Sequence, residues 1–297
     1  MWDRFRTCSE ADAPKITLLS GEFGVGKSRL GTWLGRRISE LGVGRTIVCE
    51  HGTDAYESNS LPRMVERFFG TWNLEKSEIA TQILQRLETM TGLEADQQLK
   101  YESVQLASLA ILNKRRPPED RQTARKLSTE ERFEVVTRLL ERLGRRRVPV
   151  VVFDDVDRSR EALDFVDHIG RLDEPPGCFF ILTADTDGAD PSQLEEPIER
   201  LPNAIDFRRV DVSPLAEDHV DRFVRYLLKF EDGSRERLVD ISRGYPRVVI
   251  DLVVHLIDTD QLRLTDDGYV VPAGDDLNFP DAIRKAYRET IGESLPD

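Results

Sequence analysis

The stretch GEFGVGKS, from Gly21 to Ser28, places glycines, a lysine and a serine at the spacing that can hold phosphate groups. Backbone N–H groups must wrap around the phosphate, and glycines let the backbone turn and approach it without a Cβ clash. Lys27 supplies a cation for the β and γ oxygens, and Ser28 can ligate Mg²⁺. The alternative is a glycine-rich turn that happens to contain Lys-Ser. The predicted cofactor-binding residues of this stretch are Gly21, Glu22, Phe23, Gly24, Val25, Gly26, Lys27, Ser28 and Arg29.

Two carboxylates end the apolar run VVVFDD. Asp154 stands at the carboxyl end of an expected buried strand, where open α/β sheets bind ligands, and is the predicted Mg²⁺ ligand together with Ser28. Asp155 is the predicted catalytic residue that orients or activates an attacking water. The competing interpretation of both residues is a strand-end turn or a helix cap.

A third predicted strand ends in ILTAD, which places Thr183 where a polar group can sense the γ-phosphate. Thr183 and Lys27 therefore join Asp155 as predicted catalytic residues. The alternative for Thr183 is a strand-end hydroxyl that bonds to the backbone.

Short apolar runs alternate with helical patterns and predict the scaffold of this site. A buried strand at 15–20 leads into the glycine-rich turn, and a helix from Ser28 places Leu30, Trp33, Leu34, Ile38 and Leu41 on one face. Such continuous apolar runs indicate a parallel sheet covered on both faces. Further strands are expected at 45–51, 148–155, 178–185 and 204–213.

Helical periodicity covers 61–112, and a capping box, Ser128 with Glu131, begins another helix. The segment 113–126 between them is expected to be a charged loop broken by a pair of prolines. After Pro214 the pattern is helical, followed by a hairpin with Asp267-Gly268 at its turn and a final helix.

Composition limits the class of protein. The 297 residues carry a net charge of −13, which weighs against nucleic acid as a partner. No apolar run approaches the length of a membrane span. Cys8, Cys49 and Cys178 show no metal or disulfide pattern, and a cytoplasmic location is expected. Cys49 and Cys178 stand in apolar strand-like runs, so buried thiols are expected there.

Charge is unevenly distributed along the chain. Residues 114–147 hold 12 Lys or Arg and 6 Asp or Glu, and residues 256–297 hold 4 and 10. We interpret this asymmetry as solvated faces or a docking surface rather than a nucleic-acid site.

The order of segments along the chain resembles that of the signal-transduction ATPases with numerous domains. The segments are GEFGVGKSRL, a helical insert, VPVVVFDDVD, FFILTAD, VDVSPLAEDHVDRFV and ISRGYPRVVIDLV. Within that group of ATPases, the chain is most similar to the nucleotide-binding modules of bacterial maltose-activator-type regulators and their kinase-linked relatives. These modules belong to the AAA+ side of the P-loop proteins. The resemblance covers about residues 15–290.

The resemblance implies a three-layer α/β/α P-loop NTPase fold with a parallel five-stranded sheet, then a helical lid and the start of a winged-helix-like region. The implied boundaries are 1–213 for the core, with a helical insert at about 55–147, then 214–260 for the lid and 261–297 for the hairpin and last helix. In this family a Gly-x-Pro in the lid lies against adenine, and GYPR places Pro246 there. From the residues alone, Pro246 marks only the first turn of a helix.

Two features depart from the family pattern. The Gly-Arg-Glu element that helps to close the adenine pocket is absent before Lys15, and the third strand ends in TAD rather than Thr-x-Arg. Arg145, Arg146, Arg147, Arg208 and Arg209 are candidates for an arginine acting in trans, although solvated basic surface is the simpler interpretation.

The leading hypothesis is an ATP-binding, slowly hydrolysing switch module that takes ATP or ADP with Mg²⁺ and self-associates, or binds other protein subunits, in the ATP state. The alternatives are a DNA-linked AAA+ loader or transposition-type ATPase, and a nucleotide-binding scaffold without significant turnover. A small-molecule kinase would need an acceptor pocket and a mobile arginine lid, which the sequence does not show.

Overall fold

The computed structural model describes residues 1–11, 13–50, 60–113, 116–123, 127–186, 191–201, 205–230, 232–266 and 268–270. The chain divides into two compact units. The first comprises Met1–Leu19, Ser28–Ala184 and Ala189–Val210, and the second comprises Ser20–Lys27, Asp185–Gly188 and Asp211–Asp297.

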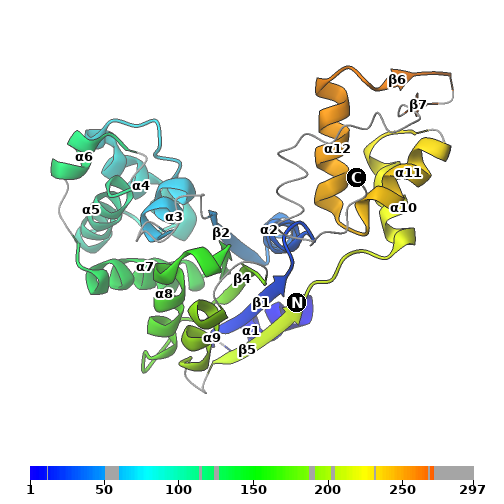
Figure 1. The fold of residues 1–297 in the computed structure, drawn as a ribbon. Coiled ribbons are helices and arrows are strands. Elements are labelled where there is room, and N and C mark those ends of the chain that lie inside the picture. Colours follow the sequence, from blue (N-terminus) through cyan, green and yellow to red (C-terminus); the bar gives the residue numbers. More distant parts are fainter. Residues whose placement is uncertain are drawn as a thin grey trace. The chain divides into compact units, whose positions relative to one another are not determined.

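A five-stranded parallel sheet forms in the described chain, as the alternating apolar runs predict (Figure 1). The strand order is β2-β3-β4-β1-β5, so β2 and β5 are the edges. Continuous burial of β3 and β4 explains their unbroken apolar sequences, whereas β5 alternates between exposed and half-buried residues, as an edge strand does. The bounds are Lys15–Gly21 for β1, Gly44–Glu50 for β2, Val148–Asp154 for β3, Phe179–Asp185 for β4 and Asp206–Asp211 for β5.

Alternation along β3 and β4 divides the covering helices into two layers. Phe153 and Phe180 contact Phe165 of α8 (Arg160–Gly170) and belong to the same core cluster as the buried face of α7 (Thr129–Gly144). The intervening residues Val152 and Ile181 face α2 (Lys27–Glu40). Side chains in a strand alternate between faces, so this segregation establishes three layers.

Helix α2 packs on the sheet through glycines, which corrects the predicted apolar face. A Cβ added to Gly31 would lie 3.2 Å from Ile181 Cγ2, so the helix backbone lies directly on β3 and β4. Leu34 and Ile38 are buried as predicted. The other three predicted members face outward because the buried stripe is centred on the glycines, four residues apart. Their exposed fractions are 40% for Leu30, 55% for Trp33 and 48% for Leu41.

A short helix at the N-terminus, α1 (Trp2–Ala11), has no counterpart among the predicted elements. Phe5 is buried and contacts Phe179 edge-on, while Arg4 donates to Asp206 Oδ1 at 2.7 Å and to the carbonyl of Ile16 at 3.0 Å. The only apolar signal was the spacing of Trp2, Phe5 and Cys8, which is too sparse to mark a helix in a polar segment.

The helices of the insert lie close together, next to α7 (Figure 1). The capping box predicted for α7 is present, with the Ser128 and Glu131 side chains each accepting from the other's backbone N–H. The predicted loop at 113–126 is wrong in part, because Pro118 begins a helical turn whose N-terminus is favoured by Glu119 and Asp120. The helices are α3 (Ser60–Phe69), α4 (Lys76–Thr91), α5 (Gln97–Ile111) and α6 (Pro118–Thr123).

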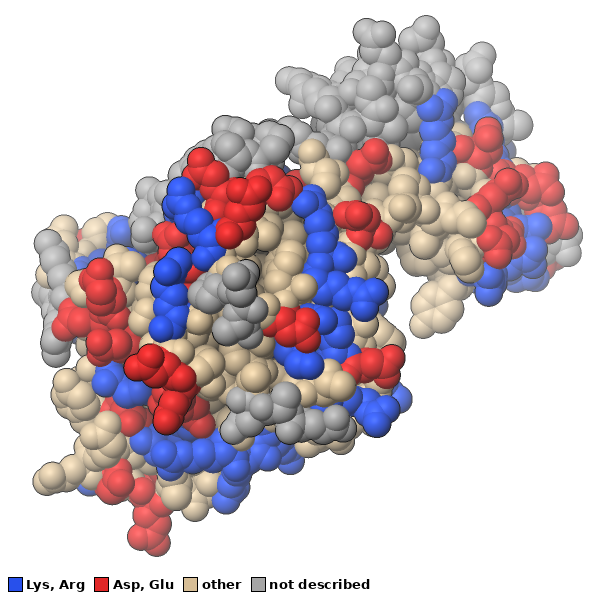
Figure 2. Space-filling model, turned by 90° about the horizontal axis from the view of Figure 1, so that it is seen from below, with Lys and Arg blue, Asp and Glu red and all other residues tan. Residues whose placement is uncertain are grey.

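The basic excess of residues 114–147 is partly neutralised inside the first unit. Arg116 pairs with the buried Glu66 at 2.9 Å, and Arg132 pairs with Glu161. Burial raises the pKa of Glu161 despite its guanidinium partner. On the face that Figure 2 shows, basic and acidic side chains are interspersed.

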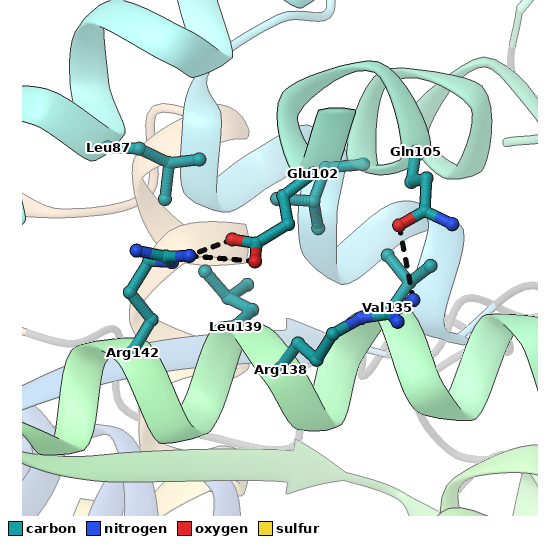
Figure 3. Close-up of a pocket in the computed structure, with 8 residues that line it drawn as sticks. Leu87, Glu102, Gln105, Val135, Arg138, Leu139 and Arg142 are labelled. Carbon is teal, nitrogen blue, oxygen red and sulfur yellow. Dashed lines mark hydrogen bonds and ion pairs between the residues drawn. The ribbon is translucent and has the colours of Figure 1, made fainter. Parts of the chain in front are cut away.

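Another such pair joins α5 to α7. Arg142 donates to both carboxylate oxygens of Glu102, at 2.6 and 2.7 Å, and Arg138 donates to Gln105 at 3.1 Å (Figure 3). The cavity beside these residues is about 10 Å³, which is room for about one water molecule. It is therefore a packing gap of the insert and not a ligand pocket.

The remaining helices of the first unit follow the ends of β3 and β4. A 3₁₀ turn, η1 (Val156–Arg158), separates β3 from α8, and α9 is Pro191–Glu199. Ser159 caps α8 by accepting from the backbone of Ala162. Cys49 and Cys178 are buried, as predicted, Cys8 is buried as well, and none of the three forms a disulfide. Among the described helices, none combines the length and apolar character that crossing a bilayer requires.

In the described part of the second unit, three helices pack together: α10 (Glu217–Leu227), α11 (Asp232–Ser242) and α12 (Pro246–Asp258). Their core includes Val220, Val224, Leu238, Val249 and Leu252. The short strands β6 (Arg263–Leu264) and β7 (Tyr269–Val270) pair antiparallel where a hairpin is predicted. The turn residue Asp267 and the predicted last helix lie outside the described residues.

The contact of α2 with the sheet predicts a sharp difference between two helical glycines. A Cβ at Gly35 would lie 2.6 Å from Thr46 Cγ2, whereas one at Gly144 would lie 3.8 Å from its nearest neighbour, Pro149. We expect Gly35→Ala to lower the free energy of unfolding by about 1–2 kcal/mol, because overpacking outweighs the gain in helix propensity. Gly144→Ala is the matched control in the same unit.

Urea unfolding of the two variants and the wild type measures this difference. Gly144→Ala should leave stability unchanged within about 1 kcal/mol or raise it. Equal stability of the two variants would contradict the close packing of α2 on the sheet.

Candidate functional site

The glycine-rich turn Ser20–Lys27 belongs to the second unit and runs directly into α2, which begins at Lys27. Gly24 and Gly26 have φ values of 85° and 103°, a conformation that side-chain-bearing residues rarely adopt. A Cβ at Gly26 would meet no described protein atom within 4 Å. The turn is therefore open at Gly26, where a backbone N–H cradle needs room for an anion.

Lys27 is buried, with 4% of its surface exposed, and its ammonium is fully engaged. Within the described chain, Nζ donates to the carbonyls of Gly21 at 3.0 Å and Glu22 at 2.8 Å, and to Asp185 Oδ1 at 2.6 Å. A lysine ammonium has three hydrogens, so these acceptors account for all of them.

Asp185 is the residue that the sequence analysis missed. It is the last residue of β4, it is 7% exposed, and it forms an ion pair with Lys27. The next residue is also tied to the turn, because Thr186 N donates to the Gly21 carbonyl at 3.0 Å. The sequence signal was the TAD ending of the strand, in which Asp185 stands where the family pattern has an arginine. From the sequence, only the absent arginine was considered, and not the carboxylate in its place.

The start of α12 contacts the glycine-rich turn within the second unit. The Tyr245 hydroxyl donates to the Glu22 carboxylate, and Arg247 N donates to the Gly24 carbonyl at 3.4 Å. Val25, Tyr245 and Val248 form a small apolar cluster. Tyr245, which carried no role in the sequence analysis, thus joins the start of α12 to the glycine-rich turn.

Pro246, predicted to lie against adenine, occupies the first turn of α12 and is half-buried. This is the position that the simpler interpretation of GYPR also requires. Its contact with a base stays a prediction.

A second group of predicted residues lies at the carboxyl ends of β3 and β4 in the first unit. The Thr183 hydroxyl donates to Asp154 Oδ1 at 2.6 Å and accepts from the backbone N–H of Asp155 at 2.9 Å. Asp155 has φ 54° and ψ 55°, a left-handed conformation that costs energy in a residue other than glycine. Thr183 therefore fixes both the carboxylate of Asp154 and the turn at Asp155.

These contacts place the predicted residues in two groups. Gly21–Lys27 and Pro246 belong to the second unit, and the remaining predicted residues Ser28, Arg29, Asp154, Asp155 and Thr183 belong to the first. Ser28 and Asp154 are both half-buried.

The donor set fits a hard cation bound with the help of phosphate oxygens rather than a cage made by the protein. No group of three or more His, Cys, Asp or Glu able to hold a metal occurs among the described residues. A serine hydroxyl and one carboxylate match the few protein ligands that Mg²⁺ takes beside nucleotide phosphates. The open turn at Gly26 and the buried cation of Lys27 fit the phosphates themselves.

A family model described as an AAA ATPase domain matches residues 3–181 of the chain. No curated protein matches the sequence. Among solved structures, the Orc1 protein of Aeropyrum pernix in complex with DNA has a TM-score of 0.49 at 15% identity, covering 97% of this chain and 65% of that one. Cdc6p from Pyrobaculum aerophilum has a TM-score of 0.47 at 13% identity, covering 87% and 62%. The chain thus spans less than two thirds of the length of either protein.

Removing the Thr183 hydroxyl should destabilise the carboxylate turn. Thr183→Val keeps the shape of the side chain but deprives the Asp155 N–H and the Asp154 carboxylate of this partner. We expect the free energy of unfolding to fall by about 1–3 kcal/mol. Thr183→Ser keeps the hydroxyl and should lose much less. Chemical denaturation compares the three proteins, and a valine variant as stable as the serine variant would contradict the bridging role of Thr183.

Proposed function

The chain belongs to the AAA ATPase domain family, and on that premise we propose that it is an ATP-binding switch module that hydrolyses ATP slowly and changes its lid with nucleotide state. One observation carries the proposal: the buried ammonium of Lys27 lies at the start of α2, in a glycine turn that the lid helix α12 also contacts. The same residues would therefore bind phosphate and report its presence to the lid.

Each side chain has a role in this proposal. Backbone N–H groups of Gly21–Ser28 and the Lys27 ammonium would bind the phosphates, and the N-terminus of α2 would favour their charge. Ser28 and Asp154 would hold Mg²⁺, which neutralises charge on the phosphates when bound. Asp155 would accept a proton from the attacking water, and Thr183 would keep both aspartates in position.

The switch is proposed to operate through the start of α12. Glu22 and Gly24 of the turn already contact Tyr245 and Arg247, so a turn that reshapes around phosphate would shift these contacts. Pro246 would add a contact with adenine. A bound nucleotide stabilises the form that it contacts by mass action, and self-association in the ATP state would follow from the shifted lid.

The finer identity is also part of the proposal. The family match supports an AAA ATPase domain, and the narrower assignment to signal-transduction ATPases with numerous domains rests on the sequence resemblance. The proposed division is a core at 1–213, a lid at 214–260 and a winged-helix-like start at 261–297, in a cytoplasmic protein. The activity and partners of a longer protein that contained this chain are proposals in the same sense.

DNA is the alternative partner, and two observations bear on it. The net charge of −13 weighs against binding to phosphodiester backbones. The Orc1 structure is a complex with DNA, which is a property of that protein. An ATP-dependent complex of this chain with duplex DNA at physiological salt would favour a DNA-linked ATPase over the switch.

Substituting the two proposed key residues separates binding from chemistry. Lys27→Ala should weaken ATP binding at least about tenfold, because it removes a charge-assisted contact that contributes roughly 1.5–3 kcal/mol. Asp155→Asn should still bind ATP, whereas its hydrolysis should slow roughly 100-fold. Fluorescent-nucleotide titration and phosphate release measure the two effects.

The matched control is Lys15→Ala, which removes the same charge at the opposite end of β1, where Lys15 pairs with Asp206 at 3.3 Å. Its ATP affinity should stay within about twofold of wild type. Equal affinities of the Lys27 and Lys15 variants would exclude the proposed phosphate site, and unchanged turnover in Asp155→Asn would reduce Asp155 to a turn residue.

A further inference from the structure

The ion pair between Lys27 and Asp185 has no role in the nucleotide binding proposed above, yet it is buried at the proposed phosphate site. The exposed fractions of the two side chains are 4% and 8%, and their charged atoms are 2.6 Å apart. Both residues belong to the second unit, so the contact lies within one compact body.

Because the pair is buried, an anion can bind to Lys27 only by displacing one of the groups that already contact it. A buried charge without a partner costs several kcal/mol, so Lys27 cannot lose Asp185 unless another anion takes its place. The three ammonium hydrogens of Lys27 are already taken by Gly21, Glu22 and Asp185. A phosphate oxygen that bonds to Nζ must therefore displace one of these acceptors.

Asp185 is the acceptor whose displacement changes the charge balance. The carbonyls of Gly21 and Glu22 are neutral, whereas the Asp185 carboxylate carries a negative charge beside the phosphate position. Like charges a few ångströms apart in a partly buried site repel by several kcal/mol. The carboxylate and the phosphate thus compete for one cation and oppose each other once both are near it.

We propose that Asp185 is a built-in competing anion, which holds Lys27 in the nucleotide-free protein and sets how tightly the site binds nucleotide phosphates. This inference rests on the proposed function, because it requires that Lys27 bind phosphate. Asp185 departs from Lys27 when nucleotide binds. Because the ion pair is lost, the protein binds ADP and ATP more weakly than it would with an uncharged residue at position 185.

The geometry also connects this displacement to the end of β4. Thr186, the next residue, is hydrogen-bonded to the carbonyl of Gly21, which is itself an acceptor of Lys27. A movement of Asp185 therefore acts directly on the glycine turn that α12 contacts.

Asp185→Asn tests the proposal because it keeps the shape of the side chain and removes its charge. The probe is ADP in the presence of EDTA, so that no metal contributes, with affinity measured by calorimetry. We expect the variant to bind ADP at least about tenfold more tightly than wild type, a gain of about 1.4 kcal/mol.

Asp211→Asn is the matched control. Asp211 is the last residue of β5 and belongs to the same unit as Asp185, but its carboxylate accepts from Ser20 Oγ at 2.6 Å and does not contact Lys27. Its removal should change the ADP affinity by less than about twofold, because an exposed charge is screened by solvent.

Each outcome decides the proposal. Unchanged or weaker ADP binding by Asp185→Asn in EDTA would overturn it, and weakening that appears only with Mg²⁺ would make Asp185 a metal ligand instead. If Asp185→Asn does not fold, Asp185→Ser is judged by the same criteria. If folded wild type and both Asp185 variants bind no nucleotide, the proposed function fails. If the wild type binds ADP and the Asp185 variants bind it no more tightly, the proposal that Asp185 competes with phosphate fails, while the proposed function stands.

Discussion

A lysine ammonium buried at the first residue of α2 requires acceptors on all sides, and much of the site follows from that requirement. The glycine turn presents two carbonyls to it, and β4 ends in a carboxylate that completes the set. The same turn contacts the start of α12 through Glu22 and Gly24. The need to satisfy one buried charge therefore brings together the end of β4 and the glycine turn, and that turn also contacts the start of α12.

The sheet positions the second group of predicted residues, at the carboxyl ends of β3 and β4, through close packing and hydrogen bonds. Gly31 and Gly35 let α2 lie directly on the sheet, where a single added Cβ would collide with Thr46 of β2 or crowd Ile181 of β4. At the carboxyl ends of β3 and β4, Thr183 joins the side chain of Asp154 to the backbone of Asp155. A left-handed residue such as Asp155 persists only where its surroundings hold it, and strain of this kind is typical of functional sites.

Much of the fold could be predicted because buried strands and helix faces have recognisable apolar sequence patterns. The unbroken apolar runs of β3 and β4 follow from cover on both faces, and the capping box of α7 is a local pattern. Lys27, Asp154 and Thr183 could be predicted as candidate site residues because each lies in or at the end of a short local motif. Helix α6 was missed because a proline pair favours a turn as readily as a first helical turn.

Other features depend on partners far apart in the sequence. Asp185 and Lys27 are 158 positions apart, and Tyr245 and Glu22 are 223 apart. Nothing local to TAD or GYPR identifies the residue that each will contact. The face of α2 was misjudged because glycines contribute no hydropathy signal, although they mark the closest packing of the helix.

The competition between Asp185 and a phosphate for Lys27 is tested by a crystal structure of the wild-type protein with ADP. We expect the β-phosphate to lie in the glycine turn with a phosphate oxygen about 3 Å from Lys27 Nζ. We also expect the Asp185 carboxylate to have moved beyond about 4 Å from that nitrogen, out of ion-pair range. A β-phosphate in the turn beside an intact pair of Lys27 and Asp185, or ADP bound away from Lys27, would contradict that competition.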